Sequence, residues 1–302
     1  MPELTVNLFG KFTVQVDGKP LAGIDSSKVQ ELLAYLLIYR DRPHPREGLA
    51  ALLWEATSSS LSKKYLRQAL WQLQNALLRA RTEKVVSIEP DWIRIAPQAN
   101  LWLDVAVFED TFALAQGIPG HDLDANVAES LERTVALYRE DLLEGWYPDW
   151  CLYERERLQN IWLAIIDKLM DYCEVKGAFE LGLAYGARVL RKDRARERTH
   201  RRLMRLAYLA GDRTGALRQY QRCVLALEEE LGVKPAKRTE DLYRAILADS
   251  LGQAELALTP VSPSHLARVA GRLSRLRSIL AQVREHVSED LDALERALSE
   301  PE

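Results

Sequence analysis

The chain contains no apolar run near the roughly 20 residues that a membrane-spanning helix needs, although 47% of its 302 residues are hydrophobic. Its first residues, Met1 to Thr5, also lack the basic segment and apolar core of a secretory signal peptide. We therefore expect a soluble globular protein of about two domains, located in the cytoplasm and with no membrane partner.

Cysteine is scarce: Cys151, Cys173 and Cys223 lie far apart among apolar neighbours, which favours core residues over a redox or metal role. The five histidines are isolated in sequence, and we expect His200 on a helix surface or between helices. The sequence also has no glycine-rich phosphate loop, no Gly-x-Ser-x-Gly and no His-Glu-x-x-His. We therefore expect no enzyme activity, no cofactor and no metal site.

Positive charge is limited as well, because 41 Lys and Arg residues face 44 Asp and Glu residues, a formal net charge of −3. Basic and acidic residues number 13 and 11 in residues 1–104, 22 and 25 in residues 105–252, and 6 and 8 in residues 253–302. Non-specific affinity for nucleic acid grows with the number of phosphates neutralised, so this balance argues against bulk electrostatic binding. A nucleic-acid contact would be local and would need more than one copy of the domain.

Residues 1–104 contain an ordered series of predicted elements. Alternating apolar residues at 4–10 and 12–16 indicate short antiparallel strands. Three helices are expected to follow: one over residues 27–40, a short one with Pro45 in its first turn, and a longer one from about Ser62 to Ala80, after a break at Ser58 to Ser60. A hairpin of residues 85–88 and 92–95 ends the series. This order is typical of a winged helix-turn-helix with an extra N-terminal sheet, whose third helix enters the major groove.

The third helix has an apolar face and a polar face. The predicted buried stripe comprises Leu66, Ala69, Leu70, Leu73, Ala76 and Leu77. The candidate DNA-binding residues are Lys63, Lys64, Arg67, Gln68, Trp71, Gln72, Asn75 and Arg79, with Arg94 on the hairpin. Lys63, Lys64 and Arg94 are expected to serve phosphates, whereas Arg67, Gln68, Gln72 and Asn75 are suited to base edges. Two alternatives stay open: the charges only solvate an amphipathic helix, or Trp71 packs on the preceding loop.

Residues 105–252 are predicted to be almost wholly helical and carry an internal repeat. An offset of 34 residues maps Leu169 onto Leu203 and Gly177 onto Gly211. This is the length of a tetratricopeptide unit, with each glycine expected in the turn between two helices. Two copies are fewer than a solenoid needs, so flanking helices should cap the stack.

A basic cluster runs from Arg188 to Arg205. Its nine members are Arg188, Arg191, Lys192, Arg194, Arg196, Arg198, Arg201, Arg202 and Arg205. The cluster either forms a second contact with DNA or polymerase, or is a solvated helix pair with ion pairs to nearby carboxylates, and the second interpretation is favoured. Beyond residue 253, Pro260 to Pro263 indicates a linker, and a heptad-like pattern from Leu266 predicts a C-terminal helix for docking, partner binding or self-association.

Three stretches together resemble the antibiotic-regulatory-protein (SARP-type) activators. The first comprises Leu8-Phe9-Gly10, residues 32–37, Leu52-Leu53-Trp54 and residues 66–77. The second is Asp104-Val105 with Phe108, which is similar to the family's hinge between domains. The third, and most specific, comprises residues 136–143, Trp150, residues 154–158, residues 196–200, Leu203-Met204, Gly211-Asp212, residues 216–220, residues 229–235 and Leu242-Tyr243.

This resemblance spans roughly residues 4–248 and implies a transcription activator that binds direct repeats near promoters and recruits RNA polymerase. The chain departs from relatives at Leu73-Gln74-Asn75, where they commonly have a Leu-Arg-Arg type ending, and at Asp91-Trp92, where they often have Gly-Tyr. The helix after residue 260 lies outside the resemblance, and no ATPase region follows it in this sequence.

The sequence therefore predicts a mainly α fold: an N-terminal winged helix-turn-helix with a small β-sheet and wing hairpin, an all-α tetratricopeptide-like repeat domain, and a C-terminal helix. The expected parts are a DNA-binding domain at 1–104, a bacterial transcriptional activation domain at 105–252, and a linker with the final helix at 253–302. The predicted function is sequence-specific binding of double-stranded DNA with contact to RNA polymerase and self-association on DNA. The alternative is a tetratricopeptide-type interaction scaffold whose winged helix no longer binds DNA.

Overall fold

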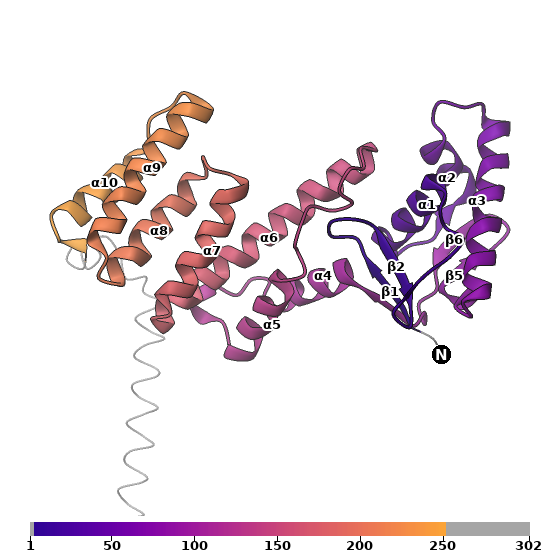
Figure 1. Cartoon of the computed structure of the whole chain (residues 1–302), viewed down its shortest axis with the longest axis horizontal. Coiled ribbons are helices and arrows are strands. Elements are labelled where there is room, and N and C mark those ends of the chain that lie inside the picture. Colours follow the sequence, from indigo (N-terminus) through magenta and orange to yellow (C-terminus); the bar gives the residue numbers. More distant parts are fainter. Residues whose placement is uncertain (1–2, 252–302) are drawn as a thin grey trace, which may run out of the picture. The chain divides into compact units, whose positions relative to one another are not determined.

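The computed structural model of the chain describes residues 3–251 (Figure 1). Residues up to Pro235 form one compact unit and residues from Ala236 onward belong to a second, in which α10 spans Lys237–Leu247. The predicted linker and C-terminal helix at residues 253–302 lie outside the described residues. Within the described part, the predicted fold class is confirmed: small sheets and three helices precede an all-helical segment.

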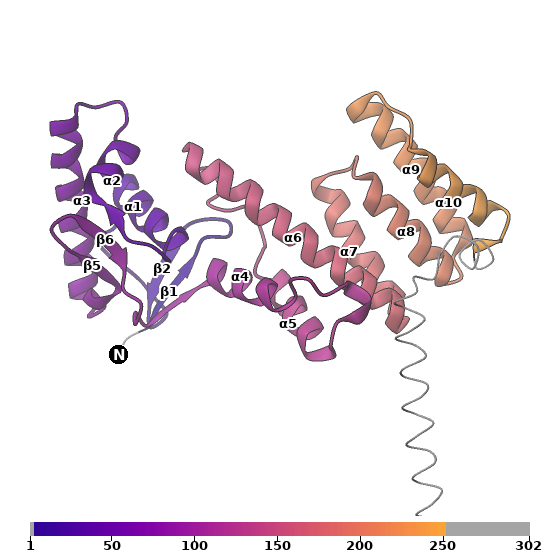
Figure 2. The same ribbon diagram turned by 180° about the vertical axis from the view of Figure 1, so that it is seen from behind.

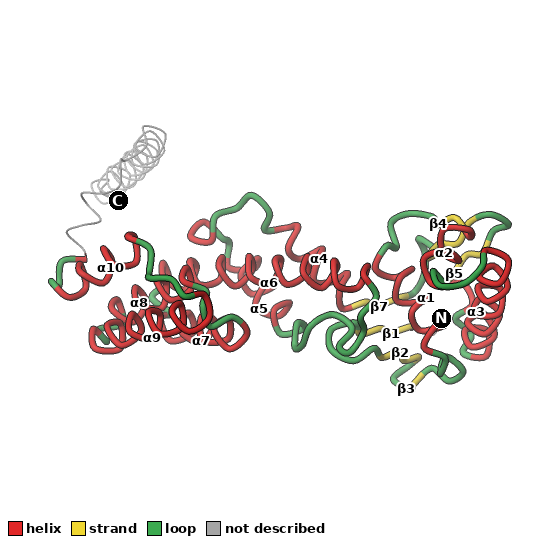
Figure 3. Tube along the Cα trace, turned by 90° about the horizontal axis from the view of Figure 1, so that it is seen from above, coloured by secondary structure: helices red, strands yellow, loops and turns green. Residues whose placement is uncertain are grey.

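The first sheet has four strands in the order β3-β2-β1-β7 (Figure 3). These are β1 (Leu4–Asn7), β2 (Thr13–Val16), β3 (Lys19–Pro20) and β7 (Leu101–Leu103). The antiparallel pairing of β1 with β2 agrees with the sequence prediction, with Val6 opposite Val14. The parallel pairing of β1 with β7 was not predicted, because it joins segments almost 100 residues apart.

The winged helix follows in the predicted order. Its elements are α1 (Ser27–Ile38), β4 (His44–Pro45), α2 (Arg46–Leu53), α3 (Ser59–Arg79), the 3-10 turn η1 (Glu83–Val85), β5 (Val86–Ile88) and β6 (Trp92–Ile95). The hairpin of β5 and β6 is present, and β4 adds a third strand beside β6 that the sequence analysis missed.

The predicted start of α3 near Ser62 was wrong by three residues. Ser58 is the N-cap residue, with extended backbone angles, and Ser59 and Ser60 lie in the first turn of the helix. Serine is favoured at helix starts, so a serine run extends this helix rather than interrupting it. The backbone N–H of Ser62 donates to the Ser58 carbonyl at 2.9 Å, which closes the first turn.

The remaining described elements are helical. They are α4 (Asp104–Leu114), the 3-10 turn η2 (Gly120–Asp122), α5 (Ala125–Val135), α6 (Asp149–Lys176), α7 (Phe179–Lys192), α8 (Glu197–Leu209) and α9 (Arg213–Leu231) (Figure 2). Gly177 and Gly211, with φ of +70° and +83°, connect α6 to α7 and α8 to α9, as the repeat predicts. Both positions adopt the left-handed conformation that glycine tolerates best.

Small residues bring these helices close together. A Cβ atom added to Gly186 of α7 would lie 2.5 Å from Cδ2 of Leu203 in α8, so only glycine fits there without a shift. Cys151, Cys173 and Cys223 are free thiols in the core, as expected. Burial raises the pKa of the Cys173 and Cys223 thiols to about 11, which keeps them protonated at neutral pH.

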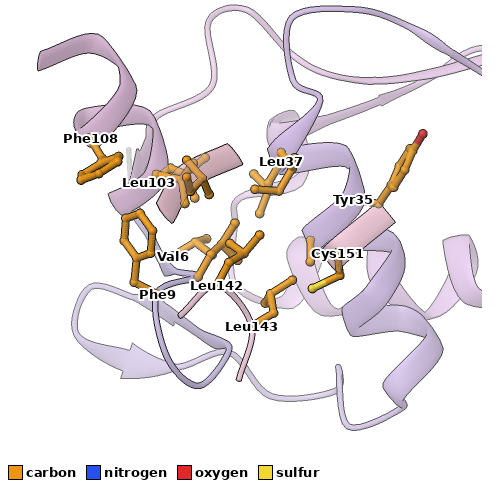
Figure 4. Close-up of a cluster of buried hydrophobic side chains, with 14 of the residues drawn as sticks. Val6, Phe9, Tyr35, Leu37, Leu103, Phe108, Leu142, Leu143 and Cys151 are labelled. Carbon is orange, nitrogen blue, oxygen red and sulfur yellow. The ribbon is translucent and has the colours of Figure 1, made fainter. Parts of the chain in front are cut away.

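The winged helix and the helical segment share a packed junction. Figure 4 shows Phe9 facing Phe108, with Leu103 and Leu142 beside them. The two phenyl rings meet edge to face at 5.1 Å, and Phe9 also contacts Tyr138 at 4.9 Å. The resemblance implied a hinge at Asp104, and in this structure the aromatic contact of Phe9 with Phe108 packs α4 against the loop that follows β1.

Asp104 forms the polar part of the same junction. Asp104 is 2% exposed, and its carboxylate accepts hydrogen bonds from the backbone N–H groups of Leu8 and Phe9, at 2.8 and 2.9 Å, and of Val105 at 2.7 Å. Burial raises the pKa of Asp104, and these three hydrogen bonds oppose that shift. The first residue of α4 therefore holds the loop that follows β1.

Candidate nucleic-acid interface

Helix α3 divides into the two predicted faces. The predicted buried stripe is confirmed, with Ser62 as an additional buried member. Its outward residues Lys63, Lys64, Arg67, Gln68, Trp71 and Arg79 are exposed, and Gln72 and Asn75 are half-buried. Figures 1 and 2 show α3 along the side of its domain that faces away from α6. The polar face is therefore open to a partner in the described part of the chain.

Four of the outward residues form a continuous line along α3. Lys64, Gln68, Trp71 and Asn75 are spaced by four, three and four positions, which places them on one side of the helix. We call this line the outer stripe. At 1.5 Å per residue it is about 16 Å long, or roughly five base-pair steps of 3.4 Å. Within residues 3–251 its side chains make no hydrogen bond or ion pair with the protein.

Trp71 does not pack on the loop before α3, which was one of the two options left open by the sequence. Its side chain is 65% exposed. The aromatic contact near the start of α3 joins other residues, Trp54 and Tyr65, whose ring centroids are 6.3 Å apart. The indole of Trp71 therefore stands free on the polar face.

The basic side chains around the stripe differ in how they are paired. Lys63 donates a short hydrogen bond to Glu47 of α2, and Arg94 of β6 lies 3.5 Å from Glu89 in the hairpin turn. The ammonium of Lys63 holds the pKa of Glu47 below its usual range. By contrast, Lys64, Arg67 and Arg79 make no ion pair among residues 3–251. Lys63 and Arg94, two of the three cations assigned to phosphates, are thus paired with a carboxylate. A DNA phosphate would have to displace this carboxylate or share the cation with it.

A hollow of about 450 Å³ lies between α2, α3 and the tip of the hairpin. It is lined by Pro45, Arg46, Glu47, Lys63, Leu66, Arg67, Pro90, Asp91 and Trp92. Arg46 was missed by the sequence analysis. Its side chain donates to the Glu89 carbonyl at 3.3 Å and its backbone N–H to the Asp91 carbonyl at 2.9 Å. The only sequence signal was its place directly after Pro45, at the first residue of α2. Arg46 fixes the hairpin turn beside the N-terminal half of α3.

The interface is joined to the helical segment by polar contacts as well as by Asp104. Arg40, which follows α1, binds Glu109 of α4 at 2.8 Å, and Glu109 also pairs with Arg157 of α6. The indole N–H of Trp150 donates to Glu31 of α1 at 3.4 Å. These contacts hold α1, against which α3 packs, on the helical segment.

Most members of the basic cluster at residues 188–205 pair with carboxylates on α6, α8 or α9 or in the loop before α6. Lys192 pairs with Asp141 at 2.9 Å, and Arg202 pairs with Asp171 at 2.7 Å. Further ion pairs join Arg194 to Glu229, Arg198 to Asp167, Arg201 to Glu197 and Arg205 to Glu174. This pattern agrees with the favoured ion-pair interpretation, because these cations hold the helix stack together.

His200 is buried and has structural partners on both ring nitrogens. His200 Nε2 lies 2.8 Å from the Arg194 carbonyl, and Gln219 of α9 bonds the other ring nitrogen at 2.8 Å. Burial lowers the pKa of His200, so the ring is neutral at pH 7. Of the two positions that the sequence left open for His200, a helix surface or a site between helices, the structure shows the second. Among residues 3–251, no three His, Cys, Asp or Glu side chains gather as a metal ion would require. No helix in that range is both long and apolar enough to cross a membrane.

Comparison with known proteins finds a family whose model matches part of this chain and a solved structure with a similar fold. The family described as the bacterial transcriptional activator domain matches residues 103–247. The solved structure of Mycobacterium tuberculosis EmbR in complex with a low-affinity phosphopeptide is similar in fold, with a TM-score of 0.65 at 20% identity over 92% of this chain and 72% of that one. No curated protein matches the chain. The family match falls on the stretch where the resemblance to the SARP-type activators was most specific, and that resemblance is confirmed.

Proposed function

We propose that this chain, whose residues 103–247 match the bacterial transcriptional activator domain, is a regulator. In this proposal it binds double-stranded DNA sequence-specifically through α3. The observation that carries the proposal is the open polar face of α3, which neither the helical segment nor the wing covers. A helix of this kind, followed by a β-hairpin, suits the major groove with the hairpin on the adjacent backbone.

In this proposal the contacts divide by chemistry. Lys63, Lys64 and Arg94 serve phosphates and fix the register of the protein on the duplex. Arg67, Gln68, Gln72 and Asn75 face base edges, and Trp71 and Arg79 lie along the same face. The small number of free cations makes a single copy a weak binder, so two or more copies would occupy direct repeats side by side.

The helical domain has the second role in the proposal, which is contact with RNA polymerase. The junction around Asp104 supports this assignment, because a domain packed on the DNA-binding domain takes a defined position on the promoter. A reconstituted transcription reaction on a promoter with the selected repeat would test activation by the whole chain.

DNA binding itself is tested by selecting duplexes from a random pool with the full chain at low salt. The proposal expects an enriched direct repeat, and it expects the Lys64→Glu, Arg67→Glu double variant to lose the enrichment. Both side chains are exposed and unpaired in the described structure, so the double variant should fold. A pool that shows no enrichment with the parent chain contradicts the proposal and favours the interaction scaffold.

A further inference from the structure

We infer that the middle of α3 recognises A·T base pairs, through side-chain amides that bind adenine and an indole that packs on the thymine methyl group. The inference rests on the proposed DNA-binding function and specifies what the same site prefers. Its basis is the chemistry of the side chains that the fold places together on the open face of α3.

The middle of the helix carries no charge. From Gln68 to Leu78 the sequence has no Lys, Arg, Asp or Glu, whereas Lys64 and Arg67 come before this stretch and Arg79 after it. Bidentate contacts to guanine use Arg or Lys, whereas Asn and Gln pair with the N6 and N7 atoms of adenine. The amides of Gln68, Gln72 and Asn75 are therefore suited to adenine at the central steps.

Trp71 supplies a second, independent feature. It is 65% exposed, and Leu78, seven positions further along the same side of α3, is 60% exposed. Exposed apolar side chains on a polar recognition face gain free energy when an apolar surface of the partner covers them. The apolar group that B-DNA offers in its major groove is the C5 methyl of thymine.

The amides and the indole also lie at matching positions. Gln68 precedes Trp71 by three residues and Asn75 follows it by four, so both are its neighbours on the helix surface. An A·T pair presents the adenine N6 and N7 atoms beside the thymine methyl across the groove. One turn of α3 thus presents the Gln68 amide and the Trp71 indole to one base pair and the next.

The test uses the duplex enriched by the parent chain. Each thymine in turn is replaced by deoxyuridine, which removes the methyl group and keeps the base pairing. We expect an A·T-rich centre in each half-site, and about fourfold weaker binding when the methyl under Trp71 is removed, as for the loss of one buried carbon. The Trp71→Ala variant should bind the unmodified duplex less tightly than the parent chain does, and its affinity should not fall further when that thymine is replaced by deoxyuridine. The Trp71→Phe variant should still lose some affinity on this replacement.

The matched control is Tyr153→Ala, which truncates another exposed aromatic side chain on α6, away from the proposed DNA face. It should respond to deoxyuridine as the parent does. Circular dichroism verifies the helix content of each variant. Trp71→Ala should fold, because the side chain is largely exposed and alanine favours helices.

Three results would overturn the inference and leave the proposed function intact: a G·C-rich centre in the enriched repeat, equal affinity for the deoxyuridine duplexes at every thymine, or a change in the oligomeric state of the free protein on Trp71→Ala. The last result would place the indole between two protein copies. Failure of the parent chain to enrich any duplex would instead contradict DNA binding itself.

Discussion

Replacing Asp104 with alanine should destabilise the junction between the winged helix and the helical domain. The carboxylate accepts hydrogen bonds from the Leu8 and Phe9 backbone N–H groups, and both residues are buried. Alanine leaves these two donors without a partner, at about 1–3 kcal/mol for each. Part of this loss is offset because the ionised carboxylate is itself desolvated, as its raised pKa indicates. We therefore expect a loss of about 2–4 kcal/mol, a large share of the usual 5–15 kcal/mol.

The assay is urea unfolding of the full chain, followed by circular dichroism and tryptophan fluorescence. Asp104→Asn keeps one acceptor oxygen but no charge and should lose roughly half as much as Asp104→Ala. Asp110→Ala, at an exposed position of the same helix, is the control and should stay within about 0.5 kcal/mol of the parent. An Asp104→Ala protein as stable as the control would refute the view that this carboxylate holds the junction.

Three further predictions concern other parts of the molecule. Glu47→Gln removes the carboxylate that pairs with Lys63 and frees this ammonium for a DNA phosphate. A fluorescence-anisotropy titration should then show up to about fivefold tighter DNA binding. Equal or weaker binding would show that the Lys63–Glu47 ion pair does not compete with phosphate. Burial lowers the pKa of His200, so below pH 6.5 the unfolded chain binds a proton more readily than the folded chain does. The free energy of unfolding should therefore fall as the pH drops below about 6.5. Melting curves that are unchanged between pH 7.5 and 5.5 would contradict this. Gly186→Ala brings a methyl against Leu203 and should cost about 1–3 kcal/mol in urea unfolding, unlike Ala184→Ser at an exposed site of the same helix.

The elements that the sequence predicted well are those with a long local period. The buried stripe of α3 follows from apolar spacing within a single helix of 21 residues. The left-handed glycines at 177 and 211 followed from the repeat. Each of these features depends on neighbours within one or two helices.

The features that were missed depend on distant partners. Strands β4 and β7 have two and three residues, too few for a pattern, and each is defined by pairing with a strand remote in sequence. The role of Asp104 depends on amides 95 and 96 residues earlier. Likewise, the sequence identified Lys63 as a cation but could not show that the fold places Glu47 beside it.

The most direct test of the proposed interface is the binding of Arg67→Ala to the enriched duplex and to single-base variants of it. Arg67 is exposed and makes no ion pair in the described structure, so the substitution should leave the fold unchanged. If α3 enters the major groove as proposed, the variant should lose about 1–3 kcal/mol of binding free energy and relax the preference at one base position. Binding to every probe with the affinity of the parent chain would contradict the proposed orientation of α3.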